Sequence, residues 1–142
     1  MIEFDTPLVP GANARLSPDH LRPTAAGVAL VGQRCQDCGR TLFPKTGICP
    51  GCRSENLADA ELPAQGTLYS WSVVYAAPKP WRTPYTIGYV DLAGDVRVFS
   101  HIAGDPATLR VGMPVALSAA PEADDGAAAA PFVFQPTAKE NA

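Results

Sequence analysis

The side chains best suited to chemistry in this 142-residue sequence are its four cysteines, which follow the spacing C-x2-C-x10-C-x2-C. They are Cys35, Cys38, Cys49 and Cys52. Each C-x2-C pair is typical of a knuckle, a tight turn that points two thiolates at one metal ion, and Gly39 and Pro50-Gly51 are residues that such turns favour. Because four protein ligands fill the coordination shell of zinc, the spacing predicts a structural rather than a catalytic zinc site.

Other uses of the cysteines fit the sequence less well. Redox-active C-x-x-C pairs belong in a βαβ setting, whereas these pairs lie in a segment interrupted by glycine and proline. Disulfides suit secreted proteins, but residues 1–5 are acidic and do not begin a signal peptide. Iron in the same cage stays open as an alternative, because tetrahedral thiolate coordination suits both metals.

The composition limits the classes of function. A net charge of -3 and a pI of about 5.2 give the chain no overall positive potential to attract nucleic acid or anionic membranes. The sequence has no apolar run of roughly 18 residues, so we expect a cytoplasmic protein without membrane association. The 15 prolines and 12 glycines favour short strands and turns over long helices.

The order of patterns predicts a mainly β protein in which a zinc ribbon precedes a five-stranded OB-fold barrel. The predicted segments are an extended N-terminal arm at 1–27 with one helical turn from Ser17, the ribbon at 28–62, the OB-fold at 63–136 and a flexible tail at 137–142. Within the ribbon, strands are expected at 28–34 and 41–44.

Five strands are expected in the barrel from period-2 alternation and turn residues. They cover residues 67–75, 85–92, 96–102, 111–117 and 131–135, with a helical turn at 105–110 and a flexible loop at 119–130. The first strand places Tyr69, Trp71 and Tyr75 on one face, and barrel packing is the simplest explanation for these aromatic residues.

The sequence carries no recognised catalytic motif. The two histidines, His20 and His101, are isolated from each other, and His101 is better explained as a half-buried strand residue than as a base. Asp91 and Asp95 flank a predicted hairpin turn, where turn chemistry accounts for them. We therefore expect a protein that takes part in reactions by holding a substrate or a partner.

A cationic loop supports this expectation. Residues 62–90 contain no acidic side chain, while Lys79 and Arg82 flank Trp81 in a proline-rich loop at 76–84. Such a loop could bind an anion that carries a ring. An ordinary solvated loop with one packed tryptophan is the alternative, and the residues alone favour neither.

Several motifs occur in an order that resembles a known family. They are Arg34–Gly39, Phe43-Pro44, Cys49–Cys52, Gly66–Trp71, Pro84–Leu92 and Leu109–Val115. Over roughly residues 28–118 the chain is similar to the OB-fold proteins with an N-terminal rubredoxin-like zinc ribbon, formerly a domain of unknown function, that accompany thiolase-like acyl-CoA enzymes. Members usually carry an amphipathic helix with aromatic residues before the ribbon, and residues 21–27 depart from that pattern.

The resemblance implies a non-catalytic accessory subunit that joins a thiolase, or an aldolase of thiolase fold, in a hetero-oligomer that degrades aromatic, steroid or fatty acyl-CoA. It also implies that Lys79, Trp81 and Arg82 contact the coenzyme A of the substrate or the partner surface. A hot-dog-fold enoyl-CoA hydratase is the alternative partner. Two further hypotheses are a single-stranded nucleic-acid module that stacks bases on Tyr69, Trp71 and Tyr75, and an independent enzyme.

Overall fold

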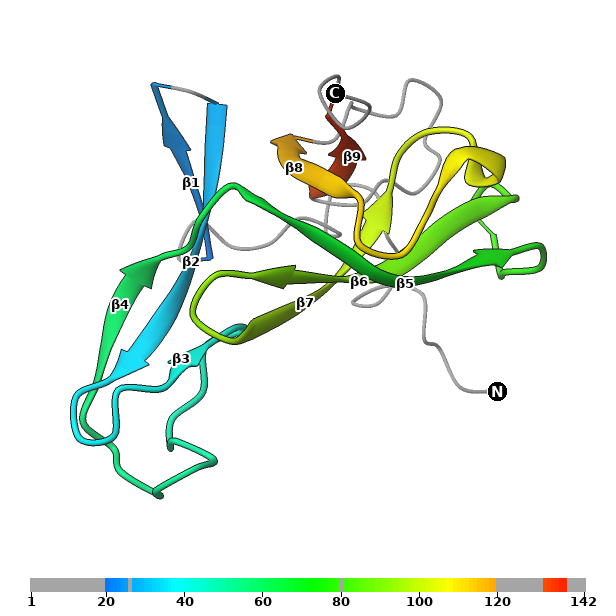
Figure 1. The fold of residues 1–142 in the computed structure, drawn as a ribbon. Helices are drawn as coiled ribbons and strands as arrows, with labels where there is room; N and C mark the ends of the chain where they lie inside the picture. The colour runs from blue at the N-terminus through cyan, green and yellow to red at the C-terminus, as the bar shows by residue number, and fades with distance from the viewer. Residues whose placement is uncertain (1–19, 26, 80, 120–131, 138–142) are drawn as a thin grey trace, which may run out of the picture.

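The computed structural model describes residues 20–25, 27–79, 81–119 and 132–137, which form nine strands and one short 3-10 helix (Figure 1). The first four strands form a small sheet and the remaining five close into a barrel. The predicted mainly β fold, with a ribbon followed by a five-stranded barrel, is therefore confirmed. In this part of the chain no helix has the length and apolar character required to cross a bilayer.

The ribbon is organised by its longest strand, β2 (Gly27–Cys35). All three of its partners pair with it antiparallel: β1 (Leu21–Thr24), β3 (Thr41–Leu42) and β4 (Leu57–Glu61). Gly32 allows β3 to approach, because a Cβ there would overlap the carbonyl oxygen of Leu42. The ribbon therefore holds the first knuckle at the end of β2, between β2 and β3.

The barrel has the strand order β5-β6-β7-β9-β8. Its strands are β5 (Gln65–Val74), β6 (Tyr85–Leu92), β7 (Val96–Ile102), β8 (Pro114–Ala119) and β9 (Phe132–Pro136). Strand β9 lies parallel to β7 and antiparallel to β8, so it joins the two strands that would otherwise be edges. This closure after a meander is the arrangement of an OB-fold.

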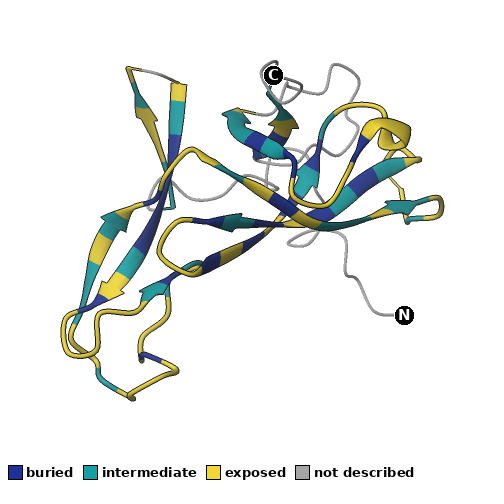
Figure 2. Ribbon diagram, in the orientation of Figure 1, coloured by how far each residue is buried: buried dark blue, intermediate teal, exposed yellow. Residues whose placement is uncertain are grey.

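Alternation along β6 and β7 decides which side chains face the barrel interior (Figure 2). Val96, Val98 and Ile102 are buried, whereas Arg97 and Phe99 are exposed, as the period-2 pattern predicts. The inward residues join one apolar core, and the outward residues form a separate face.

Ribbon and barrel share that core. Leu30 of β2 and Leu62, which follows β4, belong to the same buried cluster as Val115 and Phe134 of the barrel. Phe43 of the ribbon also packs edge-on against Phe132 of β9, with ring centroids 6.4 Å apart. The two modules are thus joined by buried apolar contact as well as by the chain.

The structure differs from the predicted elements in several places. Strand β4 was not predicted, because its sequence LADAE alternates too weakly. Residues 111–112 form a turn, so β8 begins at Pro114 rather than 111. Residues 21–24 of the predicted arm pair with β2 as a strand. The helical turn predicted at 105–110 is confirmed, as a 3-10 helix at Pro106–Thr108.

Other predictions fall on residues outside the described part of the chain. These are the helical turn from Ser17 and the rest of the arm to residue 19, nearly all of the 119–130 loop, and the tail from residue 138.

Candidate metal centre and ligand surface

The two cysteine knuckles have the same backbone geometry. The amide of Gly39 donates to the carbonyl of Cys35 at 2.9 Å, and the amide of Arg53 donates to the carbonyl of Cys49 at 2.8 Å. Gly39 and Arg53 occupy equivalent places and both have positive φ, at 83° and 66°. Glycine adopts this conformation without strain, whereas arginine does so at a cost. The knuckles are therefore related by fold rather than by identical sequence.

The knuckles bring four sulfur atoms together. Cys35 Sγ lies 3.5 Å from Cys52 Sγ, Cys38 Sγ lies 3.6 Å from Cys49 Sγ, and all four sulfurs fall within 4.8 Å of one another. Tetrahedral zinc with Zn–S bonds of about 2.3 Å keeps its sulfurs about 3.8 Å apart. These separations fit a tetrahedral ion, and they are far too long for disulfides.

The environment of the sulfurs also fits a cation. The backbone amide of Cys38 donates to Cys35 and is the main reason that the pKa of Cys35 falls to about 6. The amide of Cys52 is the main reason that the pKa of Cys49 is lowered. The Ser54 amide favours the thiolate of Cys52, but the sulfur of Cys35, desolvation, and the sulfurs of Cys38 and Cys49 oppose it and together raise the pKa of Cys52 to about 12. Four ionised thiolates at this distance need a metal ion to offset their repulsion.

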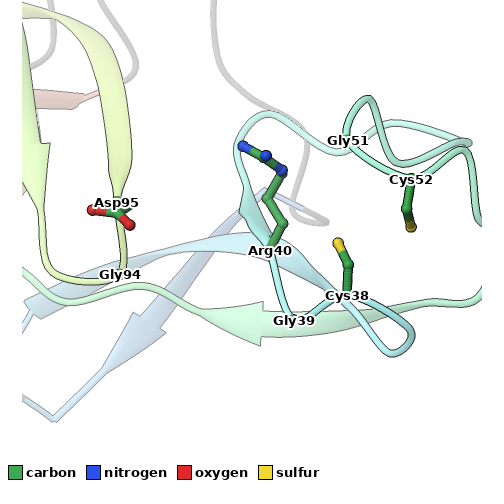
Figure 3. Close-up of a pocket in the computed structure, with 7 residues that line it drawn as sticks. All are labelled: Cys38, Gly39, Arg40, Gly51, Cys52, Gly94 and Asp95. Atoms are coloured by element: carbon green, nitrogen blue, oxygen red, sulfur yellow. The ribbon is translucent and has the colours of Figure 1, made fainter.

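An open groove of about 360 Å³ lies beside the cage, between the knuckles and the β6–β7 turn (Figure 3). Cys38 and Cys52 are exposed there, whereas Cys35 and Cys49 are buried. Arg40 crosses over Gly51, where a Cβ would lie 2.6 Å from the arginine Nε. The four sulfurs are still sufficient to fill a tetrahedral shell, so the geometry favours a structural ion.

The cationic loop lies at the end of the barrel opposite the ribbon (Figure 1). Lys79 and Arg82 are exposed, and Trp81 is half-buried. The Trp81 ring contacts His101 and Tyr85, with centroids 5.4 Å and 5.6 Å away. Of the three residues predicted to meet coenzyme A, the two cations are thus exposed and the tryptophan packs onto the barrel.

His101 completes this aromatic group. Its ring lies 5.0 Å from that of Tyr85, at an interplanar angle of 23°. Burial lowers the pKa of His101 because it disfavours the imidazolium form. The interpretation of His101 as a half-buried strand residue is confirmed.

A second aromatic group lies on the outer face of β5, β6 and β7. Tyr89 and Phe99 are paired across the strands, with 44% and 54% of their surface exposed and centroids 5.5 Å apart. Arg97 lies 3.5 Å over the ring of Tyr69 and forms two hydrogen bonds with Asp91, at 2.6 Å and 3.1 Å. We call these five residues the outer aromatic face.

Two sequence interpretations need correction here. Tyr69 and Tyr75 are 47% and 75% exposed, so barrel packing explains only Trp71, which contacts the core. The cause at Tyr69 is a β-bulge between Leu68 and Ser70 that changes the alternation. Asp91 is held by Arg97 rather than by the turn, whereas Asp95, with φ of 62°, does belong to the turn.

The outer aromatic face was not predicted, although the sequence carries a signal for it. Tyr89 in the second predicted barrel strand and Phe99 in the third each stand next in sequence to a buried valine, Val90 and Val98. Strict alternation therefore places both aromatic rings on the outward face. Within the described residues, the four cysteines form the only cluster of three or more metal-ligating side chains.

Comparison with known proteins gives matches over both modules. Residues 26–58 match the family model of the ChsH2 rubredoxin-like zinc ribbon domain, and residues 59–120 match that of the ChsH2 C-terminal OB-fold domain. The chain is 32% identical to a DUF35 domain-containing scaffold protein of Methanocaldococcus jannaschii over 114 residues, which cover 75% of this chain and 81% of the relative.

Two further proteins are similar. The benzoylsuccinyl-CoA thiolase subunit BbsA of Thauera aromatica is 39% identical over 95 residues, or 66% of each chain, so the match spans just under two thirds of that subunit. A solved structure titled Ltp2-ChsH2(DUF35) aldolase superposes with a TM-score of 0.62 at 33% identity, covering 76% of this chain and 84% of the other.

Proposed function

Because the chain belongs to the DUF35 family, which joins a rubredoxin-like zinc ribbon to an OB-fold, we propose that it is a non-catalytic accessory subunit of a thiolase-like acyl-CoA enzyme. Two relatives support this assignment by name, since one is a thiolase subunit and the other is part of an aldolase structure. The partner would be a thiolase or a thiolase-fold aldolase that acts on an aromatic, steroid or fatty acyl-CoA, and the assembly would be a hetero-oligomer.

The outer aromatic face is the observation that carries the proposal. Tyr89 and Phe99 expose large rings on a rigid sheet, and Arg97 is held in place by Asp91 and Tyr69. Tyrosine, phenylalanine and arginine are enriched at protein interfaces, and a preorganised face loses little entropy on binding. We infer that the partner enzyme covers this face.

The metal has a structural role in this proposal. The four cysteines hold zinc, and the ion fixes the two knuckles without taking part in a reaction. Lys79, Trp81 and Arg82 lie together on the loop at the other end of the barrel, where they contribute to binding the coenzyme A of the partner's substrate. The acyl-transfer chemistry belongs to the partner.

The proposal is tested by co-expressing the tagged chain with thiolase-like proteins encoded near it and purifying on the single tag. The wild-type chain should recover a thiolase-like enzyme, and Phe99→Glu or Tyr89→Glu should abolish recovery because each puts a charge into the interface. Val111→Glu is the matched control, since Val111 is 70% exposed but lies outside this face. Zinc content and melting temperature show that each variant is folded.

Three results would contradict the proposal. Recovery of the partner by both charged variants would place the interface elsewhere. Consistent recovery of a hot-dog-fold hydratase would change the partner. Turnover of an acyl-CoA by the isolated chain, at a rate that does not change with purification, would make it an enzyme.

A further inference from the structure

The metal cage is open on one side. Cys35 and Cys49 are buried, whereas Cys38 and Cys52 are exposed and both line the groove of about 360 Å³ beside the knuckles (Figure 3). A small solute that enters this groove therefore meets two sulfur atoms of the cage directly. Because access and thiolate character decide which cysteines are oxidised, the two exposed cysteines are the reactive half of the cage.

A cation lies in the same groove. The side chain of Arg40 extends from the first knuckle over the second, where a Cβ on Gly51 would lie 2.6 Å from the arginine Nε (Figure 3). Asp95, in the facing β6–β7 turn, is the other charged residue of the lining. A guanidinium beside a thiolate can donate a hydrogen bond to an oxygen that gains negative charge, such as the hydroxide that leaves a peroxide. Arg40 therefore favours the reaction of a peroxide at this surface.

Each exposed sulfur has a buried sulfur of the other knuckle close to it. Cys38 Sγ lies 3.6 Å from Cys49 Sγ, and Cys52 Sγ lies 3.5 Å from Cys35 Sγ. A disulfide has a sulfur separation of about 2.05 Å, so each pair has to close by about 1.5 Å. Bonds at these two places would join the same two knuckles that a metal ion joins. They would leave the apolar core that ribbon and barrel share untouched, because that core includes none of the cysteines.

We propose that the groove is a modification site, at which a peroxide converts the four thiolates into two disulfides, Cys38–Cys49 and Cys35–Cys52. In each pair the exposed thiolate attacks one peroxide oxygen, so that an S–O bond forms, the O–O bond breaks and hydroxide leaves. The buried thiolate then attacks the sulfur of the resulting sulfenic acid, so that the S–S bond forms, the S–O bond breaks and a second hydroxide leaves. With two protons, each pair thus reduces one hydrogen peroxide to two waters.

Oxidation then exchanges one link between the knuckles for another. The thiolate is the form of cysteine that binds a metal, so the oxidised chain has no ligands left to hold the ion. The two disulfides keep the knuckles together in its place, and a dithiol reverses them by thiol–disulfide exchange. Disulfides of this transient kind are the ones that occur in reducing compartments. The cage is therefore a reversible peroxide-sensitive site, a property separate from the accessory role proposed above.

The test treats the zinc-loaded full chain with hydrogen peroxide and follows zinc with a chromogenic chelator too weak to strip the reduced chain. Two peroxide molecules should be consumed for each ion released. Trypsin cuts after Arg34, Arg40, Lys45 and Arg53, so residues 35–40 carry the first cysteine pair and residues 46–53 carry the second. Disulfides between the knuckles link these two peptides, whereas disulfides within each knuckle leave them separate. Fragmentation of the linked peptides by mass spectrometry should assign the pairs named above.

Two comparisons complete the test. The oxidised, metal-free chain should keep the circular dichroism spectrum of the zinc-loaded chain, whereas a reduced chain stripped by a strong chelator should not. Arg40→Gln should slow zinc release about tenfold, which corresponds to one lost hydrogen bond to a charged group. Arg34→Gln is the matched control, since Arg34 is exposed but does not line the groove, and it should release zinc at the wild-type rate. Zinc content and melting temperature before oxidation show that both variants are folded.

Several results would overturn the proposal, and none of them depends on recovery of a partner enzyme. Separate tryptic peptides would show that each knuckle is oxidised within itself. Retention of zinc in excess peroxide, or conversion of the cysteines to sulfinic and sulfonic acids without a disulfide, would show that the buried sulfurs do not react with the exposed ones. Loss of the folded spectrum on oxidation would show that the disulfides cannot replace the ion. Equal rates of zinc release in Arg40→Gln and Arg34→Gln would refute the part assigned to Arg40.

Discussion

Truncation of Leu30 tests whether ribbon and barrel unfold as one unit. Leu30 is fully buried at 0% exposure in β2 of the ribbon, yet it belongs to the apolar cluster of the barrel. Leu→Ala changes at such sites cost about 2–5 kcal/mol, because the transfer free energy is lost and a cavity remains. A cost of about 3 kcal/mol lowers the melting temperature of a domain of roughly 100 residues by about 12–24 °C.

The chain offers an independent signal for each module. Both tryptophans, Trp71 and Trp81, belong to the barrel, so their fluorescence reports the barrel alone. Zinc released to a chromogenic chelator reports the ribbon. In the wild-type chain the two signals should change at the same temperature, and in Leu30→Ala both should move down together. Val111→Ala, at a site that is 70% exposed, should change the free energy of unfolding by less than about 0.5 kcal/mol.

Independent unfolding of the ribbon and the barrel would contradict a shared core. If Leu30→Ala lowers only the temperature of zinc release and leaves the tryptophan transition where it was, the core is not shared. Two separate transitions in the wild-type chain would lead to the same conclusion. If Leu30→Ala lowers the free energy of unfolding by less than about 1 kcal/mol in both transitions, the structure collapses into the cavity, contrary to the packing described.

Three other perturbations have clear expected results. Gly32→Ala should destabilise the chain several times more than Gly47→Ala, because the new Cβ meets the backbone oxygen of Leu42 in the first case and nothing within 4 Å in the second. Chemical denaturation of both variants measures the difference, and equal midpoints would contradict the prediction. Removal of zinc by a strong chelator should unfold the ribbon, since structural zinc contributes on the order of 10 kcal/mol in small modules, and a circular dichroism spectrum unchanged in the metal-free chain would exclude this role. His101 should titrate below 6.5 by NMR. Because its pKa is lowered in the folded state, the unfolded state takes up the proton at a higher pH than the folded state does. The contribution of His101 to stability is therefore complete above pH 6.5 and is lost as the pH falls through the folded pKa. A His101→Phe chain should lose less stability over this pH range, and an equal loss would assign the effect to other groups.

The sequence was sufficient for the parts of the molecule that local rules determine. The knuckle spacing identified all four cysteines, and alternation located β6 and β7 to the residue, because both strands have one buried and one exposed face. Strand β4 was missed because it is stabilised by pairing with β2 rather than by its own pattern. The exposure of Tyr69 depends on a bulge that changes the side-chain alternation and has no clear local signature.

The candidate surfaces likewise divide into residues that local sequence identifies and contacts that only the fold creates. Lys79, Trp81 and Arg82 could be selected from sequence because they are close together in one loop. The contact of Trp81 with His101 joins residues 20 positions apart and became visible only in the folded barrel. The groove beside the metal cage also combines the two knuckles with the β6–β7 turn, so no single stretch of sequence predicts it.

The position of β9 has a consequence for synthesis of the chain. Until residues 132–136 have been made, β7 and β8 each present an unpaired edge, since β9 supplies the hydrogen bonds that join them. An open edge of this kind invites pairing with another extended segment. A nascent molecule at the ribosome therefore has its cysteine pairs long before it has a closed barrel, because Phe134, which shares the buried core with Leu30, lies in the last strand of the barrel. The side chains that would hold a metal are thus present before the barrel closes, whereas the core that the ribbon shares with the barrel is complete only once the final strand has been added.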